Sequence, residues 1–395
     1  MLKYLAIFIT ILFLAVGCGE EAPVSDGQGE ETSGEPTSLE MPPVDKWLVI
    51  QDSLGVELGD SNLVFGTIVA AEFLPNGNLA VGDMARTIVN VYSPEGEYLA
   101  SVGQKGQGPG EYLMLSSFAV TPDNGFIIPD AMGGKINFYD SEYNFTHEMG
   151  GFFPAPPVGI VPVEGGFVGL KPAFEQNEDE MLTGMAVSLW TDSVQADVVY
   201  RENLIPFDMN DMGAMAKTTI MFAVDADEDV FLAQYDTENY LVTAYSPDGE
   251  ELWTIEEEFP MVRKSQEDID IEREIVRNRM TAGGAPPAMA ESYEPDEYRS
   301  MIASLAVDNH NRLWVMSGLY DGTVFRVYDG DTAEFLFTAA LRADEAHENV
   351  MPLITPYGIL AFDPTSEEWP RVYMVGAEDP ALFQHEEISE SSEQI

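Results

Sequence analysis

The most constraining feature of the sequence is a pattern that repeats at an interval of 47 residues. An apolar run ending in Asp83 follows a turn-like sequence at residues 75–78, and a second run ending in Asp130 follows another at residues 122–125. Tyr92 and Tyr139 share the same interval. Short apolar runs between turn residues indicate β-strands, and self-similarity at this period indicates stacked units that share a core. The sequence therefore predicts a β-rich repeat protein.

A glycine-rich stretch, residues 103–112, joins these two copies. It holds four glycines and a proline in ten residues, which is too much glycine for a helix or a central strand. A second shared phrase covers residues 92–99 and 245–252, which are identical at six of eight positions. We therefore interpret residues 103–112 as a tight joint between units that recur along most of the chain.

Six units can be placed, each with four strands. Their first turns are predicted near Gly77, Gly125, Gly165, Asp227, Asn311 and Gly358. Four antiparallel strands make one propeller blade, so we expect an all-β, six-bladed β-propeller over residues 45–385. The sixth unit lacks a fourth strand before the acidic tail at residues 386–395, which we expect to be disordered. The orphan strand at residues 47–51 can supply it, which would close the ring and remove its open sheet edges.

A helical insertion is predicted at residues 260–300, between the fourth and fifth blades. Ser265 and Asp268 have the spacing of a capping box, and apolar residues then recur at helical spacing to Met280. Glycines and prolines at residues 281–287 end this helix, and a second short helix is expected near Pro295. Two interpretations stay open: an insertion that packs on the rim, or a lid or partner-binding arm over the central channel.

The N-terminal segment has the features of a lipoprotein leader. Residues 1–17 place a lysine before a short apolar run, which is typical of a secretory signal peptide. The residues before Cys18 resemble a bacterial lipobox, although Ala15 stands where that pattern prefers leucine. Cys18, the single cysteine, is the predicted lipidation site, through which acyl chains would anchor the chain in a membrane. Residues 18–44 are predicted to be a disordered acidic tether.

The segment from Leu79 to Asp130 resembles tandem NHL-type repeats, and the whole chain resembles the six-bladed β-propeller lipoproteins of Bacteroidota. This resemblance implies a six-bladed β-propeller outside the cytoplasm, in the periplasm or at the cell surface, with the outer membrane favoured. It implies no particular activity, because propellers serve many functions.

The charge of the chain narrows its partners. With 18 basic and 69 acidic residues the net charge is -51, so nucleic acid, whose binding depends on Lys and Arg, is excluded as a partner. The four histidines lie far apart and show no metal-ligand spacing. The segment from Asp225 to Asp229 resembles a calcium loop but has Val230 where the glycine is required, so we predict a hairpin turn there.

Strand order places all the long loops and joints on one face of the ring, where function is expected. The candidates at this channel mouth are Asp83, Asp130, Lys105, Tyr235 and Tyr320. The two aspartates point acidic groups into the channel mouth or hydrogen-bond loop backbone, and both readings stay open. We identify no catalytic residue, and the favoured function is binding or scaffolding of an envelope protein or polysaccharide. The alternative is a calcium-dependent hydrolase or lactonase, calcium being the cofactor that it would require.

Overall fold

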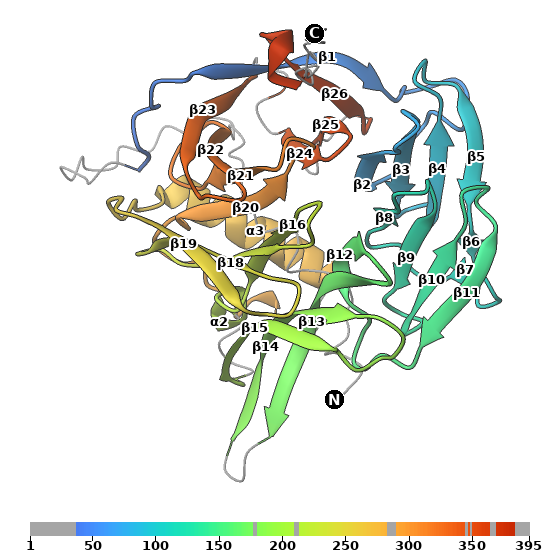
Figure 1. Ribbon diagram of the computed structural model, residues 1–395, viewed down its shortest axis with the longest axis horizontal. Coiled ribbons are helices and arrows are strands. Elements are labelled where there is room, and N and C mark those ends of the chain that lie inside the picture. Colours follow the sequence, from blue (N-terminus) through green and yellow to red (C-terminus); the bar gives the residue numbers. More distant parts are fainter. Residues whose placement is uncertain are drawn as a thin grey trace, which may run out of the picture.

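The computed structural model describes residues 37–176, 180–208, 213–282, 290–343, 347, 350–363 and 369–383. The predicted signal peptide, Cys18, most of the tether and the acidic tail lie outside these residues. Within them, the chain forms six four-stranded antiparallel blades around a common axis (Figure 1). The predicted all-β, six-bladed β-propeller is confirmed.

Each blade runs from an innermost strand outward. Blades 1 to 3 comprise β2 (Ile68–Phe73), β3 (Leu79–Asp83), β4 (Ile88–Tyr92) and β5 (Tyr98–Val102); β8 (Ala119–Val120), β9 (Phe126–Asp130), β10 (Lys135–Tyr139) and β11 (Phe145–Gly150); and β12 (Val158–Val163), β13 (Gly166–Gln176), β14 (Met181–Trp190) and β15 (Val198–Pro206). Blades 4 and 5 comprise β16 (Ile220–Val224), β17 (Val230–Gln234), β18 (Tyr240–Tyr245) and β19 (Glu251–Glu257); and β20 (Ile302–Val307), β21 (Arg312–Ser317), β22 (Val324–Asp329) and β23 (Phe335–Arg342).

The sixth blade is completed by the N-terminal strand. It comprises β24 (Met351–Thr355), β25 (Gly358–Phe362) and β26 (Val372–Ala377), with β1 (Lys46–Leu54) as its outermost strand. β1 pairs antiparallel with β26 and also parallel with β23, so blades 5 and 6 form one eight-stranded sheet. The prediction that the N-terminal strand closes the last blade is confirmed, and we call this double pairing the seam.

The core lies between the blades. Second strands such as β3 are buried along their whole length, because neighbouring blades cover both faces, whereas outer strands such as β11 are largely exposed. Six clusters of buried apolar side chains occupy the six interfaces between neighbouring blades in the described part of the chain. Tyr92 and Tyr139, the tyrosines of the repeat, donate hydroxyl hydrogen bonds to Asn62 O at 2.5 Å and to Gly110 O at 2.9 Å.

The glycine-rich joint forms a small parallel ladder of β6 (Gln104–Lys105) and β7 (Glu111–Tyr112). Glu111 fixes it by accepting the Gly108 N–H at 2.8 Å and the Gln104 Nε2–H at 2.6 Å. Gly103 has a φ of 65°, and a Cβ there would lie 2.6 Å from the Tyr112 ring. Glycine is therefore required at this first position of the joint.

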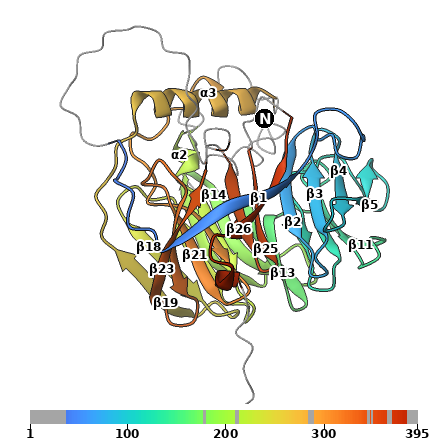
Figure 2. The ribbon, with the colours of Figure 1, turned by 90° about the horizontal axis from the view of Figure 1, so that it is seen from above.

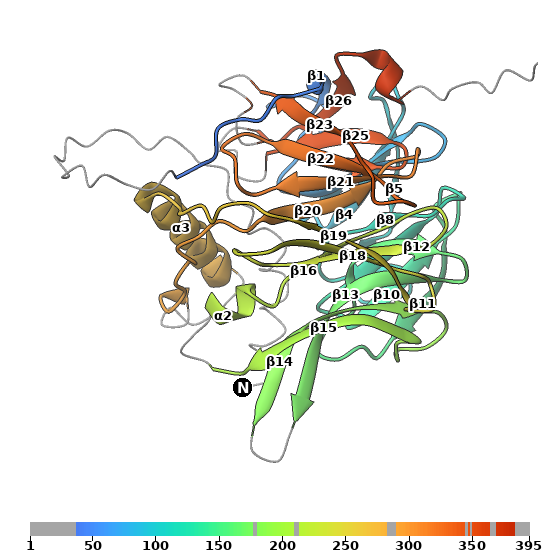
Figure 3. The ribbon, with the colours of Figure 1, turned by 60° about the vertical axis from the view of Figure 1, so that its left-hand side comes forward.

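The insertion between blades 4 and 5 carries α3 (Gln266–Ala282), which lies across one end of the ring near the short helix α2 (Gly213–Ala216) (Figures 2 and 3). Ser265 caps α3: its Oγ accepts the Asp268 N–H at 3.0 Å, and Asp268 Oδ2 accepts the Ser265 N–H at 3.2 Å. This capping box and the helical insertion are confirmed. A 3₁₀ turn, η2 (Pro380–Phe383), is the last described element.

The prediction of a second helix near Pro295 is wrong. Residues 296–300 instead run back along residues 262–264, where Tyr298 bridges Arg263 and the Lys264 N–H donates to Glu297 O at 2.8 Å. Pairing with an existing segment satisfies these backbone groups better than one isolated helical turn would.

Residues 37–44, assigned by sequence to the tether, run beside blade 5. The Leu39 N–H donates to Leu319 O at 2.9 Å, and the Leu39 side chain packs against the core cluster between blades 4 and 5. Leu39 is one of the few apolar residues in the predicted tether. Burial of its side chain explains why this end of the tether lies against the ring.

Candidate functional site

Asp83 and Asp130, the aspartates of the repeat, are both about 1% exposed and bind backbone. Asp83 accepts the N–H groups of Gly66, Thr67 and Arg86 at 2.8, 3.1 and 3.2 Å. Asp130 accepts those of Leu113, Met114 and Gly133 at 3.0, 3.3 and 3.0 Å. Each carboxylate therefore ties the joint before its blade to the loop after its second strand.

The other three sequence candidates fall into different places. Lys105 is exposed on β6, in the joint between blades 1 and 2. Tyr235 and Tyr320 are half-buried beside the insertion, in the loops that follow the second strands of blades 4 and 5. The structure thus places Tyr235 and Tyr320 beside the insertion, while Asp83, Asp130 and Lys105 belong to blades 1 and 2 and the joint between them.

The pKa values of both tyrosine hydroxyls are raised in this environment. Burial raises the pKa of the Tyr235 hydroxyl, and the neighbouring carboxylates of Asp296 and Glu272 raise it further. Burial also raises the pKa of Tyr320, whose carbonyl accepts a hydrogen bond from Arg299 at 3.3 Å. Both phenols therefore stay protonated near neutral pH and are available as hydrogen-bond donors.

A polar network holds the insertion to the ring. Glu272 of α3 accepts hydrogen bonds from Lys264 Nζ at 2.5 Å and from the Tyr293 hydroxyl at 2.6 Å. Arg299 pairs with Asp268 at 3.1 Å and with Asp321 at 2.8 Å, which joins α3 to the loop after β21. Val262 and Met301, at the two ends of the insertion, are buried in the cluster between blades 4 and 5. Several mutually bonded groups of this kind restrain a segment more than isolated surface pairs do.

We use "long-loop face" for the side of the ring that carries α3, the loop at residues 235–239 and the loop at residues 318–323. The tight turns, such as residues 75–78 and 246–250, lie on the opposite face, because the strands of a blade alternate in direction. The extended hairpin of β13 and β14 also ends on the long-loop face. These long segments therefore lie on one face of the ring, as the predicted strand order requires.

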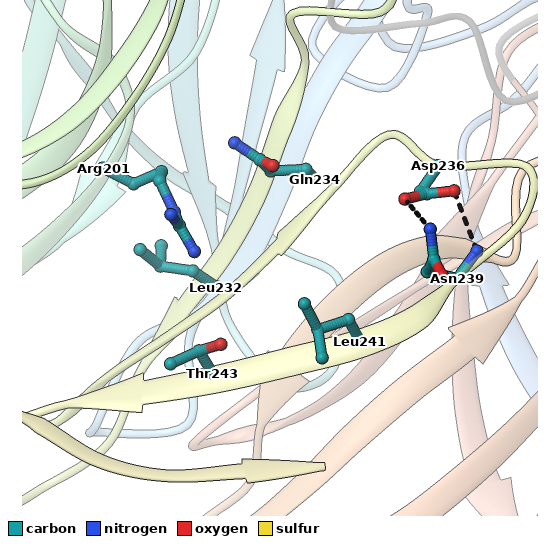
Figure 4. Close-up of a pocket in the computed structure, with 7 residues that line it drawn as sticks. All are labelled: Arg201, Leu232, Gln234, Asp236, Asn239, Leu241 and Thr243. Carbon is teal, nitrogen blue, oxygen red and sulfur yellow. Dashed lines mark hydrogen bonds between the residues drawn. The ribbon is translucent and has the colours of Figure 1, made fainter. Parts of the chain in front are cut away.

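A groove lies between blades 3 and 4 at the foot of the insertion. It is lined by Arg201, Leu232, Gln234, Asp236, Asn239, Leu241 and Thr243 (Figure 4). Arg201 comes from β15, the outer strand of blade 3, and the others from β17, β18 and their loop. Asp236 links the groove to the insertion, since its carbonyl oxygen accepts the Met301 N–H at 2.8 Å.

The loop that borders this groove is fixed by its own side chains. Asp236 Oδ1 accepts the N–H groups of Glu238 and Asn239 at 2.7 and 2.8 Å, and Asp236 Oδ2 accepts Asn239 Nδ2 at 2.9 Å. The groove is therefore preformed, which lowers the entropy lost on binding. The sequence pointed to Tyr235 in this loop but not to the groove, because the lining residues come from two blades.

A second unexpected group is Glu72, on the innermost strand of blade 1. It accepts the Val120 N–H of blade 2 at 3.2 Å. Burial raises the pKa of Glu72 from its ordinary value of 4.5 to about 8, while this hydrogen bond lowers it. The sequence carried a signal for this residue, a single carboxyl in the otherwise apolar strand of residues 68–73.

The loop resembling a calcium loop is a turn, as predicted. Asp225 Oδ1 accepts the N–H groups of Asp227 and Asp229 at 3.0 and 2.9 Å, and burial raises the pKa of Asp225 to about 6. Within the described ranges, no group of three or more His, Cys, Asp and Glu side chains is placed to hold a metal ion. Those ranges also contain no helix long and apolar enough to cross a membrane.

One family model matches part of the chain. Residues 59–155 match the model of the family DUF5128, described as a six-bladed β-propeller. No curated protein is similar enough to count as a match.

Solved structures with a similar fold come from different organisms. A protein of Bacteroides fragilis described as exported is 16% identical, with a TM-score of 0.42 over 83% of this chain and 94% of that one. A DUF4221 family member of Bacteroides vulgatus is 8% identical, with a TM-score of 0.44 over 87% and 99%. Virginiamycin B lyase of Staphylococcus aureus is 10% identical, with a TM-score of 0.41 over 83% and 98%. By its own strand topology the chain is a six-bladed β-propeller, and its match to DUF5128 covers residues 59–155.

Proposed function

We propose that the chain is an exported, lipid-anchored β-propeller of the cell envelope that binds a ligand on its long-loop face. The observation that carries the binding function is the preformed groove at the foot of the insertion. Its polar side chains are mainly amides, a hydroxyl and a guanidinium, which recognise ligands by hydrogen bonds. Asp236, its one carboxylate, already accepts three hydrogen bonds from its own loop.

The proposed location rests on the leader. Residues 1–17 and Cys18 are the only part of the chain with the pattern of a lipoprotein signal. Expressed in a bacterial host, the wild-type chain is expected to incorporate labelled fatty acid and to fractionate with membranes. The Cys18→Ser variant is expected to lose both properties. Membrane retention of Cys18→Ser without the label would reject the anchor.

The binding proposal is tested with two exposed acidic residues of blade 4 on opposite faces. Glu238 lies in the loop beside the groove, and Asp248 lies in a tight turn on the other face. The full chain with Cys18→Ser is immobilised and envelope polysaccharide is passed over it. Glu238→Trp is expected to reduce retention and Asp248→Trp to leave it unchanged. Equal retention by both variants would reject the long-loop face as the binding face.

Calcium-dependent hydrolysis is the competing function, and it has its own test. A calcium-loaded enzyme should gain several degrees of melting temperature with calcium and lose them with EDTA, because a ligand of the native state stabilises it. For a binding propeller without a metal we expect the two melting curves to coincide. A reversible calcium shift would favour the hydrolase instead.

A further inference from the structure

We infer that the groove between blades 3 and 4 is a binding site for an acidic sugar, with Arg201 as the partner of the sugar carboxylate. This inference rests on the proposed binding function and adds the chemical class of the ligand. Arg201 has no partner among the residues that the structure describes, in a protein where acidic side chains outnumber basic ones by 69 to 18.

Arg201 differs from the other arginines whose side chains the structure describes. Those residues form ion pairs, hydrogen bonds or other electrostatic interactions, as in the pairs of Arg326 with Glu257 and of Arg342 with Glu378. For Arg201 no such interaction is present within the described residues, and its Nε is buried without a hydrogen-bond partner. A guanidinium stays charged at any physiological pH, so a buried N–H without an acceptor has a free-energy cost. The two terminal Nη groups are not buried in this way, so they can donate two parallel hydrogen bonds to one ligand carboxylate.

The rest of the groove suits the hydroxyls of a sugar. Gln234 has no side-chain hydrogen bond within the described part of the chain, and Asn239 donates one N–H to Asp236 while its amide oxygen stays available. An amide can donate to one hydroxyl and accept from the next, and the Thr243 hydroxyl can do the same. Leu232 and Leu241 supply apolar surface for the C–H groups of a sugar ring, as Figure 4 shows between Arg201 and Asn239.

The charges around the groove determine the salt concentration at which binding of an acidic ligand should be measured. Asp236 is the carboxylate of the groove, and its oxygens are occupied by hydrogen bonds from Glu238 and Asn239. The net charge of -51 repels any anion at long range, whereas Arg201 acts only at contact. Salt screens the long-range repulsion, so binding is measured at about 0.5 M salt, where the Debye length is only a few ångströms.

The experiment titrates uronate trisaccharides into the full chain with Cys18→Ser and follows the heat of binding. The probes are trigalacturonate, triguluronate and a glucuronate-containing trisaccharide, each with its methyl ester as a neutral control. We expect at least one acid to bind, and its ester to bind about tenfold more weakly or worse. We expect Arg201→Gln to weaken the acid by about tenfold or more and to leave the ester unchanged, because only the acid uses the charge. Arg342→Gln, which removes a paired arginine elsewhere on the ring, is expected to leave both affinities unchanged.

The outcomes separate this inference from the function on which it rests. If no uronate binds, or if Arg201→Gln binds the acid as tightly as the wild type, the acidic-sugar site is rejected. Retention of envelope polysaccharide would then show that binding occurs through other chemistry. Binding of a uronate that depends on Arg201 without any retention of envelope material would support the site and reject the proposed envelope ligand. Circular dichroism of Arg201→Gln establishes that the variant is folded, so a loss of binding is a loss of the contact.

Discussion

Asp83 and Asp130 make the same three hydrogen bonds in neighbouring blades. Each accepts the backbone N–H of residues 17 and 16 positions before it and of the residue three positions after it. The repeat seen in the sequence is therefore a repeat of a structural contact, in which one carboxylate closes each joint. We therefore expect each of these carboxylates to stabilise the folded ring.

Replacing Asp83 or Asp130 by alanine is expected to lower the free energy of unfolding by about 2–4 kcal/mol. Each change leaves three partly buried backbone N–H groups without their acceptor and removes charge-assisted hydrogen bonds. Urea denaturation measures the effect. Glu97→Ala, at an exposed position in a turn of blade 1, should change stability by less than about 0.5 kcal/mol. Aspartate variants as stable as this control would contradict the structural role.

The raised pKa of Glu72 predicts that the stability of the fold falls as the pH rises. Its pKa is about 8 in the folded protein and 4.5 ordinarily, so the folded state holds a proton that the unfolded state releases. Its contribution to stability is therefore complete below about pH 4.5 and is lost as the pH rises toward 8. Glu72→Gln keeps a neutral acceptor for the Val120 N–H and does not titrate. Its melting temperature should equal that of the wild type at pH 4.5 and exceed it increasingly up to pH 8.5, and parallel pH profiles would show that Glu72 ionises freely.

Ser265→Ala is expected to loosen the insertion without unfolding the ring. The change removes one bond of the capping box, which costs about 0.5–2 kcal/mol of helix stability. Hydrogen exchange should accelerate in the first turns of α3 while protection in β17 and β21 is unchanged. Glu274→Ala, at an exposed position in α3, is the matched control and should leave exchange slow. Faster exchange throughout the blades would mean that the insertion and the ring unfold together.

Because β1 closes the ring, truncating one of its buried side chains should lower the free energy of unfolding substantially. Leu48 of β1 is fully buried in the cluster between blades 5 and 6. Leu48→Ala should lower the free energy of unfolding by about 2–5 kcal/mol, the usual cost of truncating a buried leucine. Leu58, 84% exposed, provides the control, for which alanine should be neutral. Chemical denaturation distinguishes the two, and a neutral Leu48→Ala would show that β1 contributes little to closing the ring.

The sequence predicted the parts of this molecule that depend on local pattern. Six blades and the cap at Ser265 follow from periodicity or from residues a few positions apart. The closing strand followed from a count of strands, because the sixth unit lacks a fourth strand of its own. The groove could not be predicted in this way, because what distinguishes Arg201 is that no described residue across the blade interface pairs with it. The supposed helix near Pro295 failed for a related reason: residues 296–300 pair with residues 262–264, across a long insertion. Interactions distant in sequence leave no local signal.

The double pairing of β1 also sets the order of events during biosynthesis. β1 emerges from the ribosome first and β26 last, yet the two are neighbours in the finished ring. Almost the whole chain must therefore be made before β1 can find its place, and contacts so distant in sequence form slowly. Until then the edges of β23 and β26 stay open to other chains. If the chain is exported, as residues 1–18 predict, we expect it to cross the membrane unfolded and to close its ring on the far side.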